Sequence, residues 1–386
     1  MWQMIQADKL PRNRYDLAEL AGAFGDLGTL IPFVVAYVTI LQMNPNSILV
    51  GFGVALIAVG LFYRTPFPVQ PMKAIGASAV SQFSIASGLT SSIVVSASLM
   101  TGVIWFLLAI TGVANKVSKY IPKSALLGVV MGLGFSFMAE GLRMMATDMY
   151  VAGFLLMLTL ALLNRPKVPA MFVLLAIGIA LAIYNKPQLL NELSAIKPEF
   201  VLPSLAIPTL TANDLWLGLI MLALPQLPLT FGNAYVSITE ENNKLFPNRK
   251  VKEKTVALST AFMNLFAGAV GSVPMCHGAG GMAGHIQFGA RTGGATVMLG
   301  VLLLSAGVFF PSSITTIFKL FPTSVLGVIL FLAGVQLALG SRDNSTEKAD
   351  RFIVLATAGI AVFNVGLAVL FGIASHQLAK RNLFKF

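Results

Sequence analysis

The chain alternates long apolar runs with short polar segments. Residues 93–114 and 295–310 are examples. A helix needs about 20 residues to cross a bilayer, and these runs are close to that length. We therefore predict an all-α membrane protein with fourteen transmembrane segments, some of them short. The predicted spans are residues 20–40, 47–63, 68–88, 93–114, 124–142, 149–164, 168–184, 214–237, 255–271, 273–289, 293–311, 323–340, 351–364 and 365–380.

Composition supports a membrane protein over a soluble one. Of the 386 residues, 56% are hydrophobic and only 11% are charged, against about 25% charged in a soluble domain. A soluble fold of this length cannot hide so much apolar surface. The net charge of +11 suggests nucleic acid at first, but the basic residues lie in short loops without interleaved aromatic side chains. We expect a lipid bilayer as partner and no nucleic acid.

The distribution of positive charge predicts the orientation. With both termini cytoplasmic, 21 of the 26 Lys and Arg residues lie inside, four lie outside, and Lys73 falls within a span. This skew follows the positive-inside rule, so we expect a multi-pass protein of the cell membrane. The cytoplasmic N-terminus, residues 1–19, lacks the pattern of a cleaved signal peptide, and residues 381–386 form a short cytoplasmic tail.

Two halves of seven spans each are expected. The extracytoplasmic linker 185–213 separates residues 20–184 from residues 214–380. Residues 121–126 (Ile-Pro-Lys-Ser-Ala-Leu) resemble residues 321–326 (Phe-Pro-Thr-Ser-Val-Leu), each at the start of the fifth span of its half. Pro71-Met72 likewise matches Pro274-Met275 in the third spans. An odd number of spans per half predicts a 7+7 inverted repeat, as in many secondary transporters.

The third and tenth spans do not have the pattern of continuous helices. Pro68 and Pro71 interrupt the third, and Pro274 and a glycine-rich run interrupt the tenth. Non-helical backbone at membrane depth persists only where protein buries it or where it lines a cavity. Matching interruptions in two halves indicate a transporter's binding site. In the predicted topology, each span contains a half-helix whose N-terminus lies near the midplane.

The charge at these two N-termini suits an anion. Each helix start contributes about +0.5, so together with Lys73 the site would hold about +2. Such a site would balance a tetrahedral dianion, which backbone N–H groups bind well. Two alternatives stay open: the prolines could be simple kinks, and the long stem of Lys73 could carry its charge to the cytoplasmic interface.

Other polar residues within spans are weaker candidates. Asp26, with nearby Thr29, lies about 10 Å into the first span at about 1.5 Å per residue. It is a candidate for binding a coupling ion or proton, or it could pair within the bundle. Gln226, Thr230 and Asn233 follow i, i+4, i+7 spacing on the eighth span, which Pro225 and Pro228 should kink. They could offer neutral donors to a ligand or bond between helices.

The sequence predicts neither a metal site nor an enzyme. Cys276 and His277 are adjacent, but no second pair stands at ligand spacing. No nucleophile and base form a catalytic set, so we expect no catalytic residues and no cofactor. His277, at the predicted half-helix start, could instead donate to an anion.

Several motifs resemble a known family. They are residues 67–73 (Phe-Pro-Val-Gln-Pro-Met-Lys), 274–281, 288–293, 25–29 and 231–234. Across nearly the whole chain the sequence is similar to the molybdate transporters of the sulfate-permease superfamily. The resemblance implies a core domain of spans 1–4 and 8–11, a gate domain of spans 5–7 and 12–14, and elevator-type movement. It also implies a homodimer as a candidate assembly.

The resemblance further implies which residues face the anion. They are Gln70, Met72, Lys73, Cys276, His277 and Gly278, and their neighbours Ala74 and Met275 complete the candidate set. The predicted function is secondary active transport of molybdate. Sulfate or tungstate transport on the same fold stays open, as does a nucleobase-type permease, although such permeases usually place a carboxylate where the eighth span has Gln226 and Asn233.

Overall fold

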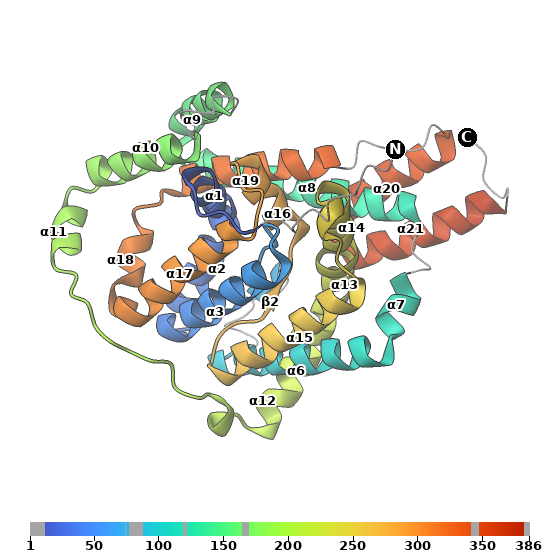
Figure 1. Cartoon of the computed structure of the whole chain (residues 1–386), viewed down its shortest axis with the longest axis horizontal. Coiled ribbons are helices and arrows are strands. Elements are labelled where there is room, and N and C mark those ends of the chain that lie inside the picture. The colour runs from blue at the N-terminus through green and yellow to red at the C-terminus, as the bar shows by residue number, and fades with distance from the viewer. Residues whose placement is uncertain are drawn as a thin grey trace, which may run out of the picture.

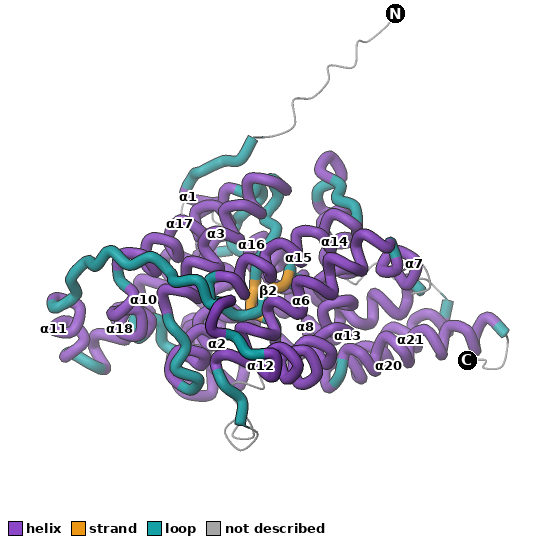
Figure 2. The backbone as a smooth tube through the Cα atoms, turned by 90° about the horizontal axis from the view of Figure 1, so that it is seen from below, coloured by secondary structure: helices purple, strands orange, loops and turns teal. Residues whose placement is uncertain are grey.

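The computed structural model describes residues 12–73, 75–76, 88–118, 122–163, 170–340 and 347–381. These residues form many helices around one short two-stranded ribbon (Figures 1 and 2). Helices account for the apolar runs because a helix satisfies its own backbone hydrogen bonds, which lipid cannot do.

In the first half, helices lie within a few residues of the predicted spans except the third, whose residues 77–87 are not described; α7 and α11 are additional short helices, and α11 lies in the predicted linker. The helices of this half are α1 (Leu17–Ala23), α2 (Leu27–Thr39), α3 (Pro45–Tyr63), α6 (Ser91–Thr111), α7 (Val113–Ser118), α8 (Lys123–Met145), α9 (Met149–Leu162), α10 (Ala170–Asn185) and α11 (Gln188–Ser194). A 3-10 turn, η1 (Phe24–Asp26), separates α1 from α2, and η2 (Ala146–Asp148) separates α8 from α9. Strand β1 is Gln70–Pro71.

The second half is also mostly helical, with one short strand. Its helices are α12 (Ala212–Leu217), α13 (Leu224–Phe231), α14 (Ile238–Leu245), α15 (Glu253–Ala269), α16 (Ala279–Gln287), α17 (Gly294–Phe309), α18 (Ile314–Phe318), α19 (Thr323–Gly340), α20 (Lys348–Phe363) and α21 (Val365–Lys380), with strand β2 at Met275–Cys276. Two π-helices, η4 (Gly218–Ala223) and η5 (Gly232–Ser237), flank α13. The chain bends by 43° between Ala212–Leu227 and Leu229–Leu245, which confirms the predicted kink.

Length and apolar character identify candidate membrane helices. In the described residues, four helical segments are long and apolar enough to cross a membrane, or seven if each sharply bent pair is one span. The four segments are Leu17–Thr39, Pro45–Tyr63, Ser91–Thr111 and Lys123–Leu162. Large apolar side chains also lie on the surface, such as Phe363, Tyr150 and Met157, where lipid would cover them. The full count of fourteen stays a prediction.

The helices form two packed groups. One contains α3, α6, α15 and α17, and the other contains α8, α19, α20 and α21 (Figure 1). Helix α8 approaches α19 so closely at Gly134 and Gly334 that a Cβ on either would lie 2.7 Å from the carbonyl oxygen of the other. Small residues permit this contact in membranes. Helices α2 and α16 pack against α19 of the second group. Because α2 also contacts β1 and α16 follows β2, the ribbon lies near the boundary between the two groups.

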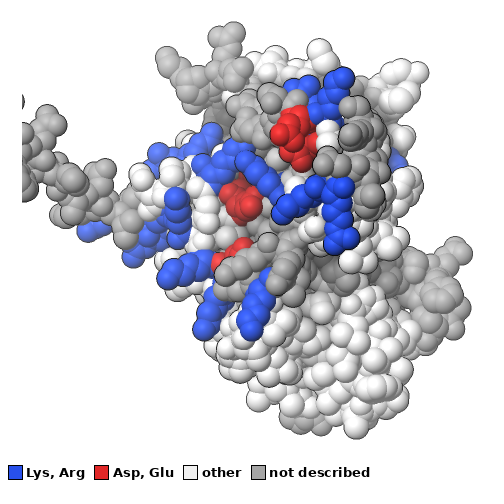
Figure 3. Space-filling view, turned by 90° about the vertical axis from the view of Figure 1, so that its right-hand side faces the viewer, with Lys and Arg blue, Asp and Glu red and all other residues white. Residues whose placement is uncertain are grey.

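The basic residues gather on one side of the molecule. Figure 3 shows many Lys and Arg side chains on the face that forms the right-hand side of Figure 1, where α7, α20 and α21 lie. Helices α11 and α18 lie at the opposite end. The cytoplasmic orientation of this face and of the termini stays a prediction.

Candidate anion-binding site

The two interrupted spans meet at an antiparallel ribbon in the centre of the fold (Figure 2). Gln70 pairs with Cys276 and Pro71 with Met275, and the Met72 N–H donates to the Pro274 carbonyl at 3.0 Å. The prolines prevent helix here, and the ribbon supplies the hydrogen bonds that the helix would have made.

Each strand runs into a helix. Helix α16 begins at Ala279, directly after β2. After β1, Lys73 lies in helical backbone, and the Gly76 N–H donates to the Met72 carbonyl at 2.8 Å. Because the strands are antiparallel, the chain leaves the ribbon in opposite directions after Pro71 and after Cys276. Residues 77–87 and the candidate Ala74 lie outside the described residues.

Asp26, Thr29 and Gln70 form one buried cluster. Asp26 lies in η1, at the break between α1 and α2, and Thr29 follows on α2. The Gln70 Nε2 donates to the Asp26 carboxylate and to Thr29 Oγ1, the latter at 2.8 Å, and the Thr29 hydroxyl donates to Asp26 at 2.5 Å. The structure thus joins the predicted coupling residues to a predicted anion ligand.

Gln70 also reaches the start of α16. A Cβ on Gly278 would lie 1.8 Å from Gln70 Oε1 and 3.7 Å from Asn233 Nδ2, so only glycine allows this approach. Gly278 is the N-cap residue of α16 and makes no side-chain hydrogen bond to the helix. The first backbone N–H groups of α16 have no partners within the helix. Among the described residues, neither Gln70 Oε1 nor Asn233 Oδ1 has a hydrogen-bond partner.

Lys73 contributes a buried charge. Its Nζ is enclosed by protein and has no hydrogen-bond partner in the described part of the chain, so in this structure the stem does not carry the ammonium to an interface. The Nζ lies 3.3 Å from the ring centroid of Phe137 on α8. Phe137 also occupies the space beside Gly280, where a Cβ would meet its ring at 2.2 Å. No local motif in the sequence marks Phe137 as a site residue.

The His277 ring is held by the protein on both sides. Its Nδ1 bonds to the Pro68 carbonyl at 2.9 Å, its Nε2 bonds to Ser259 at 2.8 Å, and Ser259 bonds to Tyr63 at 2.7 Å. Since an anion would compete with these bonds, the ring in this structure holds the ribbon in place and is not free to bind a ligand.

Asn264 on α15, which no sequence motif marks, also holds the ribbon in place. Its side chain accepts from the Met275 N–H at 2.9 Å and donates to the Met275 carbonyl at 2.7 Å. Met72, Met275 and Cys276 are buried beside the polar groups and form apolar walls.

The eighth-span candidates separate into two places. Gln226 donates to Thr230 at 3.0 Å within α13, whereas Asn233, in the π-helix η5, lies beside Gly278. Asn233 thus lies at the end of the ribbon where α16 begins. Among the described residues no group of three His, Cys, Asp or Glu side chains could hold a metal ion.

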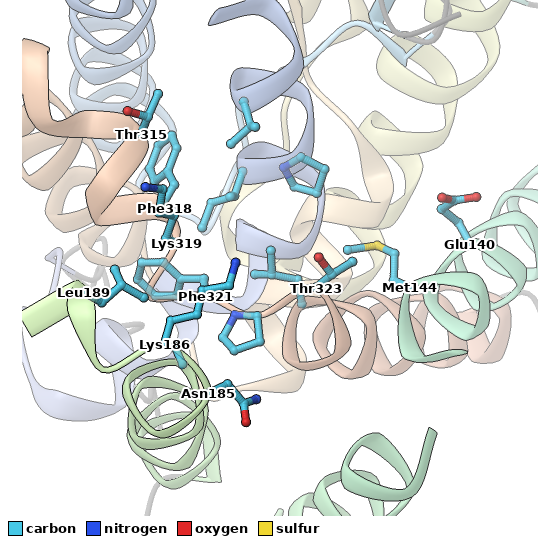
Figure 4. Close-up of a pocket in the computed structure, with 16 residues that line it drawn as sticks. Glu140, Met144, Asn185, Lys186, Leu189, Thr315, Phe318, Lys319, Phe321 and Thr323 are labelled. Carbon is cyan, nitrogen blue, oxygen red and sulfur yellow. The ribbon is translucent and has the colours of Figure 1, made fainter. Parts of the chain in front are cut away.

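A cavity of about 470 Å³ lies apart from the ribbon, toward α11 and α18 (Figure 4). Residues of α2, α10 and α18 line it together with Lys186, Lys319 and Glu140. Outside it, Glu192 on α11 forms an ion pair with Lys319 at 2.9 Å. None of the ribbon residues lines this cavity.

Comparison with solved structures shows the fold. The transmembrane domain of a cyanobacterium bicarbonate transporter, BicA, aligns with a TM-score of 0.61 at 16% identity, covering 91% of this chain and 96% of that one. The murine Solute Carrier 26 family member A9 anion transporter, in its inward-facing state, aligns with a TM-score of 0.64 at 13% identity, covering 97% and 70%. The link to sulfate-permease-like transporters is therefore one of fold.

Comparison of sequences shows the family. A family model described as "Molybdate transporter of MFS superfamily" matches residues 18–137 and 218–337. Molybdate transporter 2 of Arabidopsis thaliana is 30% identical, covering 92% of this chain and 85% of the relative, and Molybdate transporter 1 of the same plant is 29% identical, covering 90% and 85%. The chain is a multi-pass membrane protein and not an enzyme. It belongs to the molybdate transporter family.

Proposed function

We propose that the protein is a secondary active transporter that binds molybdate between the N-termini of α16 and of the helix that begins near Lys73. Backbone N–H groups at Gly278 and Ala279, the amides of Gln70 and Asn233, and the Lys73 ammonium form the binding site. Met72, Met275 and Cys276 exclude water from it, and the His277 ring positions the ribbon.

The observation that carries the proposal is the buried Lys73 Nζ without a hydrogen-bond partner in the described residues. An isolated buried charge is costly, and an intramembrane ionisable residue is functional by default. Asp26 interacts with this ammonium electrostatically but does not bond to it in the described residues, and the proposed anion would supply the hydrogen-bonded counter-ion. Two helix starts at about +0.5 each and one ammonium balance a doubly negative anion.

The double match of the family model supports the inverted repeat. Two segments, 18–137 and 218–337, fit the same description 200 residues apart, the spacing at which Pro122 and Pro322 repeat. We propose that α3, α6, α15 and α17 belong to the core and that α8, α19, α20 and α21 belong to the gate. Movement of core against gate would then expose the site to each side in turn. Asp26 and Thr29 are the proposed coupling residues.

Uptake of molybdate into proteoliposomes containing the purified chain tests the proposal. We expect uptake that tungstate suppresses strongly, because it is the closest tetrahedral dianion in size, with weaker suppression by sulfate and none by uracil. Competition by uracil alone would instead identify a nucleobase-type permease. No competition by any of the oxyanions would refute an oxyanion site.

A further inference from the structure

The Gln70 side chain lies between the Asp26 carboxylate, which needs a hydrogen-bond donor, and the start of α16, which offers N–H donors. On one side its Nε2 donates to the Asp26 carboxylate and to Thr29. On the other side its Oε1 points toward Gly278, the N-cap of α16, where a Cβ would lie 1.8 Å away, whereas the Nε2 lies beside Gly281, three residues further along. An amide has donors on one end and an acceptor on the other, so the group that faces Asp26 fixes the group that faces α16.

With Asp26 ionised, this arrangement disfavours an anion. The carboxylate accepts only, so it holds the amide nitrogen, and the carbonyl oxygen is left at the positive helix start. There it occupies the place of an oxyanion and presents negative partial charge to it. Burial of the cluster strengthens both effects, because the local dielectric is low.

With Asp26 protonated, the arrangement can reverse. A carboxylic acid has one O–H donor, which can donate to Gln70 Oε1 after the amide turns over. The Nε2 then faces the start of α16 and can donate to an oxyanion beside Lys73. We infer that Asp26 and Gln70 form a proton-operated switch that couples anion binding to uptake of a proton. The inference rests on the proposed function.

The ligands around Asp26 favour a proton over a metal cation. Both side chains that contact its carboxylate, Gln70 and Thr29, contribute hydrogen-bond donors, whereas hard cations require several oxygen acceptors. The step balances simply: Asp26 takes a proton on the side from which the anion enters and returns it on the side where the anion leaves. No covalent bond of the anion changes.

Other titratable groups face this cluster. His285 on α16, Lys73 after β1 and Cys276 on β2 interact electrostatically with Asp26. The His285 Nδ1 bonds to the Gly22 carbonyl at 2.9 Å, and its buried Nε2 has no partner among the described residues. Helix α19, which packs on η1 and α2, has no titratable side chain. Asp26 is therefore the acidic group that the amide contacts directly.

The test is the pH dependence of molybdate binding to the purified chain, measured by calorimetry between pH 5 and 9. Molybdate itself is a dianion over most of this range. Wild-type affinity should fall by up to about tenfold per pH unit where one proton is taken up on binding. Asp26→Asn should bind with an affinity that changes less than about twofold across the range, because its amide nitrogen permanently supplies the donor. Glu199→Gln, which alters an exposed carboxylate on the linker, should keep the wild-type slope.

Gln70→Met separates the switch from simple charge repulsion and covers the case in which Asp26→Asn does not fold. It keeps Asp26 but removes the amide, so weak binding without a pH slope is expected. A wild-type slope in Gln70→Met, or in Asp26→Asn, would overturn the switch. Binding by the wild type without any slope would overturn it while leaving the proposed function intact, whereas no molybdate binding at any pH would overturn both.

Discussion

The two strands of the central ribbon come from equivalent places in the two halves, yet their polar side chains are used differently. On the β1 side, Gln70 Oε1 and Lys73 Nζ have no partner in the described residues. On the β2 side, Asn264 bonds to the Met275 backbone, and the His277 ring is bonded at both nitrogens. Under the proposed function, the first strand would present side chains to the anion, whereas the second would provide a fixed helix start.

This asymmetry is chemically reasonable. A helix N-terminus binds an anion through backbone groups, so β2 needs rigidity and not free side chains. In the proposed switch, the Gln70 amide must turn over when Asp26 is protonated, and Lys73 supplies the positive charge. The β1 side therefore needs side chains that are free to move.

Lys73→Ala should reduce molybdate affinity at least about 100-fold, and Lys73→Glu should abolish uptake, since removing one partner of a buried charge pair costs about 3–5 kcal/mol. Radioactive molybdate uptake, with the amount of protein in the membrane measured in parallel, checks this. Lys319→Ala, at an exposed ion pair, is the matched control and should change uptake less than about twofold. Normal uptake by Lys73→Glu would remove Lys73 from the site.

Asn264→Leu should act mainly on stability. It leaves the Met275 N–H and carbonyl buried without their side-chain partner, at a cost of about 1–3 kcal/mol for each unsatisfied group. Thermal unfolding in detergent should show a marked drop in Tm, while molybdate affinity of the folded fraction changes little. A large loss of affinity at unchanged Tm would contradict the assignment of β2 as the fixed strand.

The ribbon shows which structural features the sequence can predict and which it cannot. Pro68, Pro71 and Pro274 exclude continuous helix by local chemistry, and the apolar runs define the helices, so both features could be predicted. The partners of His277 could not, because Ser259 and Pro68 come from other elements and no periodicity points to them. From the sequence, His277 is a candidate donor to the anion, whereas in the structure both ring nitrogens bond within the protein.

The contact between Asp26 and Gln70 shows the same limit. Each residue could be recognised as an unusual polar group inside a span, but their pairing joins positions 44 apart in sequence. Phe137 has no polar atom and lies in an ordinary apolar helix, so only packing against Lys73 reveals it.

Phe137→Leu should have a moderate effect in the opposite direction from Lys73→Ala. The ring stabilises the ammonium of the empty site, and a cation–π contact is worth about 0.5–1 kcal/mol or more when buried. Its loss should therefore tighten molybdate binding about two- to fivefold in calorimetry. Phe135→Leu, on the same helix but partly exposed, should leave the affinity unchanged. Equal effects in both variants would exclude a specific role for the ring.

Cys276→Ala should have the smallest effect. The thiol is buried on β2, and the proposed contribution of this strand is through its backbone and apolar walls. We expect less than about a twofold change in affinity and uptake. A loss of uptake beyond about tenfold, with an unchanged Tm, would show that the second strand also presents a side chain to the ligand.

The most direct test of the central claim is the location of the metal atom in a crystal of the molybdate-bound protein, from anomalous scattering of molybdenum. We predict one peak between Lys73 and the start of α16 at Gly278, within hydrogen-bonding distance of Gln70 or Asn233. A peak only in the cavity beside Lys186 and Lys319, with the ribbon unoccupied, would contradict the account.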